Sequence, residues 1–169
     1  MAKSVHDQLQ SLDLVLRIQV IDPVDTEMRE WYKDHKAARQ GDAGIDLFVS
    51  QDTVVPAHSS LLIPLGVRCA LGNTFTERLY SYDLRSRSSI YKTPLIQQNG
   101  VGLCDSSFSG ELKIAAHNLS GEDYLVTRGT RLVQISSPYL SPIKVQLVEG
   151  FHTVTERGEG GFGSTGTGV

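Results

Sequence analysis

Five segments of the sequence combine charged, hydroxyl-bearing or aromatic side chains with turn-forming residues, and these segments could do chemistry. They are residues 43–48 (AGIDLF), 85–89 (RSRSS), 99–111 (NGVGLCDSSFSGE), 129–134 (GTRLVQ) and 157–166 (RGEGGFGSTG). In the first, Asp46 stands in an apolar run, and a carboxylate buried there must be paired or must bind a cation. The alternative is that Asp46 is an ordinary turn or pairing residue. In the second, two arginine forks and three hydroxyls suit a phosphate group, although such residues also make ordinary solvated turns.

The third segment has the form of a hairpin whose glycines let the backbone approach a ligand closely. Asp105 follows the apolar residues Leu103 and Cys104, a setting that could tune a general base. Phe108 offers a flat surface to a sugar or a base. The alternative is an ordinary hairpin whose turn begins at Asp105. The fourth segment alone indicates only a turn that leads into a strand.

Residues 157–169 are unusually rich in glycine, with six glycines among 13 residues. A segment of this composition cannot bury enough apolar surface to order itself. It is therefore either a frayed end or an arm that a ligand orders. An arginine, an aromatic ring and two hydroxyls among the glycines suit a ligand that carries an aromatic base and phosphates. They belong to Arg157, Phe162, Ser164 and Thr165.

The elements that must position these segments are mainly short strands. Alternating apolar residues from Leu16 to Val20 indicate a strand. Further strands are expected at 45–50, 53–55, 61–71, 78–85, 112–117, 124–127, 131–136 and 145–148. One helix is expected over 23–36, because Met28, Trp31, Tyr32 and His35 share a helical face, with Asp22 as its N-cap. Many short strands separated by turn residues predict an all-β sandwich, jelly roll or barrel.

Length and composition fit one globular domain. The chain has 169 residues, 40% hydrophobic and 21% charged, with 16 basic and 19 acidic residues and a net charge of −3. This mild acidity argues against binding to nucleic acid duplexes, which requires a basic surface. No apolar run is long enough to span a membrane, and the N-terminus lacks a secretory signal. With two cysteines that are expected to be reduced thiols, we expect an intracellular protein, cytoplasmic or nuclear and not secreted.

In their order and joint content, the five segments closely resemble the five motifs of the trimeric deoxyuridine triphosphate diphosphatases (dUTPases). The resemblance covers about residues 14–166, and the segment 157–166 is its most specific part. It implies a β-jelly roll that assembles as a homotrimer, with each active site built from three subunits. The expected organisation is an N-terminal extension (1–13), a jelly-roll domain (14–156) and a flexible C-terminal arm (157–169) that closes over the active site.

The resemblance also implies a reaction, the hydrolysis of dUTP to dUMP and pyrophosphate with Mg²⁺. Such an enzyme limits uracil in DNA and supplies dUMP for dTMP synthesis. By this resemblance, Asp105 is the general base that orients the water attacking the α-phosphorus. Asp46 supports the waters bound to Mg²⁺, and Arg157 clamps the γ-phosphate. The physics agrees, because triphosphate chemistry consists mostly of positioning and charge neutralisation.

The remaining site residues implied by the resemblance contact the substrate. Uracil is read by Asn99 and by the backbone at Gly102 and Leu103, and Phe162 stacks on it. Phe108 lies under the deoxyribose and excludes a 2′-hydroxyl. The expected contacts to phosphate or water come from Arg87, Ser88, Gln134, Ser164 and Thr165. Ser89, where many relatives have glycine, and Gly163 are the other expected substrate-binding residues.

Three positions depart from the family pattern, and two other functions share the fold. Phe108 replaces a common tyrosine, Ser107 a common acidic residue and Thr130 a common aspartate. The first alternative is a dCTP deaminase-like enzyme, which lacks this form of the fifth motif. The second is a non-catalytic nucleotide-sensing module, which has no use for a general base such as Asp105.

Overall fold

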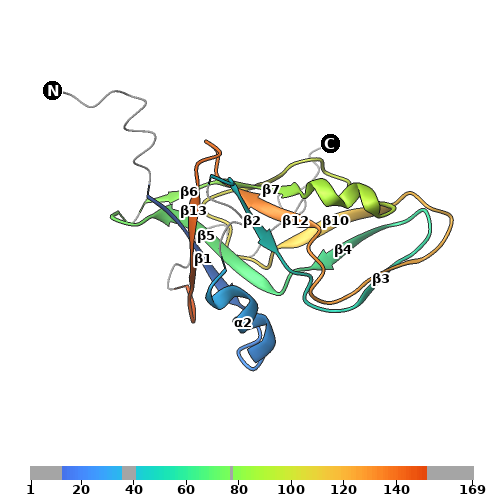
Figure 1. Cartoon of the computed structure of the whole chain (residues 1–169), viewed down its shortest axis with the longest axis horizontal. Helices are drawn as coiled ribbons and strands as arrows, with labels where there is room; N and C mark the ends of the chain where they lie inside the picture. The colour runs from blue at the N-terminus through green and yellow to red at the C-terminus, as the bar shows by residue number, and fades with distance from the viewer. Residues whose placement is uncertain (1–12, 36–40, 77, 152–169) are drawn as a thin grey trace, which may run out of the picture.

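The computed structural model describes residues 13–35, 41–76 and 78–151 (Figure 1). This part of the chain is almost entirely β-structure, with one α-helix and one short 3-10 helix. In chain order the elements are β1 (Leu14–Val20), α2 (Thr26–Lys33), β2 (Gly44–Leu47), β3 (Thr53–Val55), β4 (Ser60–Pro64), β5 (Val67–Asn73), β6 (Leu79–Tyr80), β7 (Tyr82–Ser86), η1 (Ser88–Lys92), β8 (Leu95–Gln97), β9 (Gly102–Cys104), β10 (Lys113–Asn118), β11 (Tyr124–Val126), β12 (Val133–Ser136) and β13 (Ile143–Leu147). The predicted mostly-β architecture with one helix is confirmed.

The strands form four small sheets, and most of their pairings are antiparallel. One sheet has the order β13-β1-β5-β6, in which β1 runs parallel to β13 and antiparallel to β5. The sheet that matters for the site has the order β2-β12-β7-β9. The other two are β4-β10-β8 and β11-β3. Segments far apart in the sequence therefore become neighbours, as Figure 1 shows for β2 and β12.

The core follows from the alternation of apolar residues along the strands. Leu16 and Ile18 on β1 are fully buried, as are Ile45 and Leu47 on β2. On these strands the residues between them point away from the core, so Asp46 faces outward from the same strand that buries Ile45 and Leu47. Burial of this apolar set, at about 25 cal/mol per Å², is the main force that holds β2 in place.

The helix is shorter than the sequence predicts, and its N-cap is a different residue. It spans Thr26–Lys33, and the carboxylate of Asp25 accepts a hydrogen bond of 3.0 Å from the Met28 amide. Asp22 instead accepts from the Val24 amide in the turn before the helix, so its prediction as the N-cap is wrong. The predicted helical face is confirmed at Met28 and Tyr32, which are both buried.

Two predicted strands are each divided in the structure. The stretch 61–71 is interrupted between β4 and β5, where Gly66 has a φ of +63° that favours glycine. An ideal Cβ on Gly66 would lie 2.7 Å from Cβ of Ser50, so the turn also lacks space for a side chain. The stretch 78–85 is divided into β6 and β7. None of the described helices is long and apolar enough to cross a membrane.

Candidate active site

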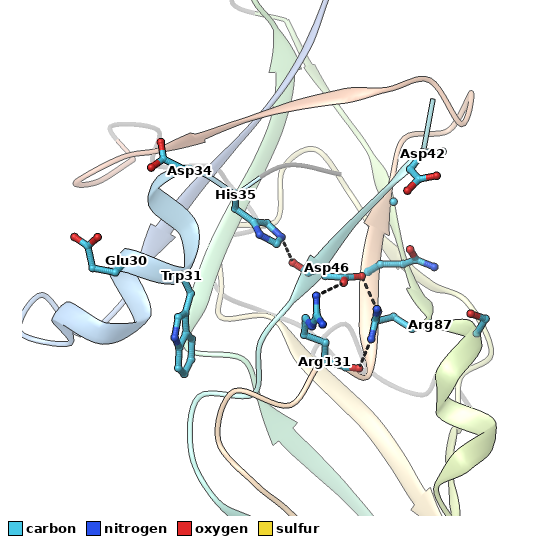
Figure 2. Close-up of a pocket in the computed structure, with 12 residues that line it drawn as sticks. Glu30, Trp31, Asp34, His35, Asp42, Asp46, Arg87 and Arg131 are labelled. Carbon is cyan, nitrogen blue, oxygen red and sulfur yellow. Dashed lines mark hydrogen bonds and ion pairs between the residues drawn. The ribbon is translucent and has the colours of Figure 1, made fainter. Parts of the chain in front are cut away.

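A cavity of about 720 Å³ opens between α2, β2, β12 and the segment that follows β7. It brings together four of the predicted site residues, Asp46, Arg87, Ser88 and Gln134. Figure 2 shows the side chains of Asp46 and Arg87 pointing toward one another. The remaining lining residues are Glu30, Trp31, Asp34, His35, Asp42, Ala43, Gly44 and Arg131.

Asp46 is held between two arginines. Its Oδ1 lies 2.7 Å from Nε of Arg87, and its Oδ2 lies 3.1 Å from Nη1 of Arg131 (Figure 2). Only 15% of the Asp46 side chain is exposed, so these two charges compensate the partial loss of solvent. The sequence left open whether this carboxylate is paired or binds a cation. The structure pairs it, and both partners remain partly exposed to the cavity.

Arg87 is fixed by more than its ion pair. It directly follows β7, and its backbone amide donates to the Leu132 carbonyl at 2.9 Å. Its Nη1 donates to the Arg131 carbonyl at 3.1 Å and to Oγ of Ser89 at 3.2 Å. Ser89 thus orients Arg87, while Ser88 at the start of η1 lines the cavity. The neighbouring Arg85 turns aside to pair with Asp83 at 2.7 Å.

The strand register sets the relation between Asp46 and Gln134. The two residues are direct partners on β2 and β12, so their side chains leave the sheet on the same face. Both line the cavity, together with Gly44 on β2. The motifs around residues 46 and 134, distant in sequence, thus become one surface through an antiparallel strand pair.

The helix α2 and the two residues after it supply cavity residues that the sequence did not identify as functional. Trp31 and His35 line the cavity, as do the exposed carboxylates of Glu30 and Asp34. The helical spacing of Trp31 and His35 was recognised, but it indicated a core face. Burial is the largest influence on the His35 ring and lowers its pKa, which favours the neutral form. Arg131 was also missed, because an arginine beside a turn carries no distinguishing signal.

A second cavity, of about 340 Å³, gathers the predicted residues of segment 99–111. Asn99, Gly102, Leu103, Asp105 and Phe108 all line it. The strand β9 holds them by pairing with β7, where Leu103 lies opposite Asp83. The other lining residues are Leu84, Cys104, Glu111, Leu112 and Lys113.

The backbone near Asp105 forms the turn that the sequence predicts. The Asp105 carbonyl accepts a hydrogen bond of 3.0 Å from the Phe108 amide, which brings the Phe108 ring back toward the cavity. Leu103 is 68% exposed, so its strand presents an accessible surface. The predicted hairpin is wrong, because β9 pairs with β7 whereas its chain neighbours β8 and β10 pair with each other in another sheet. The predicted turn at Asp105 is present, and the segment forms the wall of a cavity.

The two cavities share no lining residue within the described part of the chain. One holds the arginines, and the other holds Asp105. Strand β7 connects them, because Leu84 on this strand lines the second cavity and Arg87, just after its end, lines the first. The predicted residues Arg157, Phe162, Gly163, Ser164 and Thr165 lie outside the described residues.

The chain is similar to known proteins over most of its length. A family model described as dUTPase matches residues 32–166. The deoxyuridine 5′-triphosphate nucleotidohydrolase of Hydrogenovibrio crunogenus is 38% identical over 132 residues, which cover 76% of this chain and 83% of that protein. The corresponding protein of Eremothecium gossypii is 36% identical over 126 residues, covering 73% of this chain and 77% of that one.

Solved structures show the same fold. A dUTPase from Streptococcus mutans has a TM-score of 0.53 and 24% identity, covering 69% of this chain and 88% of that one. A mutant dUTPase of Staphylococcus bacteriophage 80alpha has a TM-score of 0.56 and 22% identity, covering 90% of this chain and 98% of that one. Because the family model spans most of the sequence and relatives above 30% identity cover most of their own length, the chain belongs to the dUTPase family.

Proposed function

We propose that this protein hydrolyses dUTP to dUMP and pyrophosphate, and that it thereby limits uracil in DNA and supplies dUMP for dTMP synthesis. The observation that carries the proposal is the sorting of the site residues into two cavities of different character. The first presents arginines and hydroxyls and suits a triphosphate. The second presents a backbone strand and a phenylalanine ring and suits a nucleoside. Together they match the two halves of one nucleotide.

The first cavity is the proposed triphosphate site. Arg87 and Arg131 carry the positive charge, and Ser88 and Gln134 add hydrogen-bonding groups. An arginine fork binds phosphate oxygens in two parallel hydrogen bonds, which gives orientation as well as charge neutralisation. The ion pairs to Asp46 fix both guanidinium groups beside the cavity before substrate binds, so little reorganisation is needed at the moment of reaction.

The donor set suits a magnesium ion that arrives on the substrate. In residues 13–35, 41–76 and 78–151, no group of three or more His, Cys, Asp or Glu side chains could hold a metal. Both oxygens of Asp46 already pair with arginines, so this carboxylate would act through metal-bound water. Mg²⁺ keeps several waters and commonly binds through one or two carboxylates and the substrate phosphates, so this arrangement fits it. When bound, it would neutralise charge on the triphosphate.

The second cavity is the proposed nucleoside and water site. Asp105 would accept a proton from the water that attacks the α-phosphorus. This attack would break the bond from the α-phosphorus to the oxygen that bridges the α- and β-phosphates, and pyrophosphate would leave. Phe108 would pack under the deoxyribose, where a 2′-hydroxyl has no space. Asn99 and the backbone of Gly102 and Leu103 would read the uracil edge, a pattern that rejects cytosine.

We further propose that the protein works as a homotrimer with an arm over each site. One subunit holds its arginines and its Asp105 in different cavities, which supports a site in which cavities of neighbouring subunits meet around one nucleotide. The proposed organisation is an extension (1–13), a domain (14–156) and an arm (157–169). Arg157, Phe162, Gly163, Ser164 and Thr165 of the arm would complete the contacts to phosphate and base. We propose that the protein is intracellular, in the cytoplasm or the nucleus, where nucleoside triphosphates are found.

The test is product analysis with the purified protein. dUTP, dCTP and UTP are incubated with and without Mg²⁺, and nucleotide, pyrophosphate and ammonia are measured. We expect dUMP and pyrophosphate from dUTP, dependent on Mg²⁺, and little from the other two. Asp105→Asn should bind dUTP and lose most turnover, because positioning survives the loss of the proton acceptor. Ammonia from dCTP would instead identify a deaminase, and binding without turnover would identify a nucleotide sensor.

A further inference from the structure

Strand β2 has one free edge, and side chains from helix α2 and from the residues just after it contact this edge. In the sheet order β2-β12-β7-β9, β2 pairs only with β12. An edge strand leaves backbone N–H and C=O groups without strand partners. Here the Phe48 amide, just past β2, donates to the Tyr32 hydroxyl at 3.0 Å. The Asp46 carbonyl lies 2.9 Å from Nε2 of His35 (Figure 2).

The chemistry of these groups defines the direction of both hydrogen bonds. A carbonyl oxygen only accepts, so Nε2 of His35 must carry the proton and donate it to Asp46. A backbone amide only donates, so the Tyr32 oxygen is the acceptor for Phe48. The helix supplies the acceptor Tyr32, and the residue two positions beyond its end, His35, supplies a donor to the same strand edge.

Aromatic packing keeps the two side chains in place. Tyr32 has no exposed surface. The Phe48 ring lies 5.2 Å from the Trp31 and Tyr32 rings and 5.3 Å from the His35 ring, measured between centroids. Tilted and edge-to-face contacts of this kind are individually favourable and have defined geometry. The end of β2 is thus fixed both by hydrogen bonds and by a cluster of four rings.

Asp46 is consequently restrained from two sides. His35 holds its carbonyl on the outer edge of β2, while Arg87 and Arg131 hold its carboxylate on the cavity side. If the strand edge shifts, the carboxylate must shift with it or lose its arginine geometry. A change in position of about 1 Å in a site that works by orientation costs on the order of a hundredfold in rate.

We propose that Tyr32 and His35 are positioning residues, which fix the place of the Asp46 carboxylate by holding the free edge of β2. This inference rests on the proposed role of Asp46 in the triphosphate site. The proposed role includes no proton transfer and no metal binding by either side chain. The helix therefore contributes to catalysis through the strand it covers.

The decisive variants remove or restore single hydrogen-bonding groups. His35→Leu removes the donor, His35→Gln keeps an N–H donor at a similar reach, and Tyr32→Phe removes only the acceptor hydroxyl. For His35→Leu we expect kcat to fall about tenfold with KM for dUTP changed less than about threefold, because the nucleoside cavity is untouched. The Mg²⁺ concentration for half-maximal rate should rise several-fold, and His35→Gln should recover most of the loss.

A second measurement does not depend on activity. Hydrogen exchange of the Phe48 amide should be faster in Tyr32→Phe than in the unaltered protein, because that amide loses its acceptor. Met28→Ala is the matched control. Met28 is buried on the same helix and lies near the turn between β4 and β5, where an ideal Cβ on Gly66 would be 3.3 Å from its Sδ and Cε. We expect this control to lower Tm while kcat and the Mg²⁺ dependence stay unchanged.

The outcomes separate this inference from the proposed function. If the unaltered protein fails to hydrolyse dUTP, the proposed function is wrong. If it is active and His35→Leu keeps its kcat and Mg²⁺ dependence, the positioning role is wrong. The role is also refuted if the loss of kcat relative to the loss of Tm is the same in Met28→Ala as in His35→Leu, since the helix would then matter only for stability. It is refuted as well if His35→Gln recovers none of the kcat that His35→Leu loses.

Discussion

The amide of Gln134 occupies the space beside Gly44 in which any other residue would carry its Cβ. An ideal Cβ on Gly44 would overlap Oε1 of Gln134 and lie 2.7 Å from its Cδ. The two residues come from adjacent strands, since β12 pairs with β2. The absence of a side chain at residue 44 is what allows Gln134 to lie along β2 and line the cavity.

Replacing Gly44 should therefore affect activity more than stability. In Gly44→Ala the new methyl group displaces the Gln134 amide, which is the flexible end of a long side chain and can rotate away. We expect Tm to change by no more than about 4 °C, equivalent to about 1 kcal/mol or less. The value of kcat/KM for dUTP should fall about tenfold, because a hydrogen-bonding group leaves the phosphate site.

The matched control for this variant is Gly121→Ala. A Cβ on Gly121 would meet only Nε2 of His58, at an ordinary contact distance of 3.6 Å. This control should keep both Tm and kcat/KM. Equal activity in the two alanine variants would show that the orientation of Gln134 does not matter for turnover.

The separation of Asp105 from Arg87 predicts rescue between subunits. Asp105→Asn and Arg87→Met homotrimers should each be nearly inactive. If one site takes Asp105 from one subunit and Arg87 from another, mixed trimers contain some sites with both residues intact. Unfolding and refolding the two variants together should then restore a substantial fraction of activity. The rate of the mixture is compared with that of each variant refolded alone. A mixture no more active than its components would place both residues of each site in one subunit.

Much of the fold could be predicted because it depends on local patterns. Alternation of apolar residues identified β1, β2 and β10. The predicted N-cap was wrong because Asp22 and Asp25 are both reasonable caps in the sequence. The structure selects Asp25, whose carboxylate also binds Arg128, a partner 103 residues away. A local pattern contains no information about such a contact.

The candidate site shows the same division between local and long-range features. Asp46, Arg87, Asp105 and Gln134 could be named because each stands in a recognisable segment. His35 could not, because its contact with the Asp46 carbonyl depends on where the chain runs after the end of α2. Its periodicity fits the core face of a helix equally well. Residues that act through packing are identified by the structure, and residues that act through a motif are identified by the sequence.

Sugar selectivity should depend on Phe108. This ring lines the nucleoside cavity and packs against the core. Phe108→Ala should open space for a 2′-hydroxyl and raise the rate with UTP relative to dUTP, because the contacts to uracil remain. Both substrates are assayed with each variant by pyrophosphate release. Phe75→Ala, which removes a ring that is 79% exposed and lies outside both cavities, is the control. If both variants keep the dUTP to UTP ratio of the unaltered protein, another group discriminates the sugar.

The pH dependence of stability should reveal the ion pair between Asp25 and Arg128. Arg128 binds both oxygens of Asp25, at 2.7 and 2.9 Å, and its guanidinium lies 4.9 Å from the centre of the Trp31 ring. It also donates to the Ser50 carbonyl, so it ties α2 to the loop that follows β2 and to the turn before β12. Desolvation acts to raise the pKa of Asp25, but the hydrogen bonds from Arg128 and the Met28 amide and the charge of Arg128 together lower this pKa below its ordinary value.

A lowered pKa in the folded state defines the pH range in which the pair is stabilising. The contribution is fully present above the ordinary aspartate pKa of about 3.9 and is lost as the pH falls through the lower value of the folded protein. Asp25→Asn isolates the charge, because asparagine is also a good N-cap and can still accept from the Met28 amide. Its Tm should lie below that of the unaltered protein at pH 7, and the difference should shrink as the pH is lowered below about 4.

Asp22→Asn, in the preceding turn, should show a smaller difference, because Asp22 accepts from the Val24 amide and asparagine can accept there too. A Tm difference for Asp25→Asn that stays constant from pH 7 to pH 3 would show that the ionised carboxylate contributes nothing to stability.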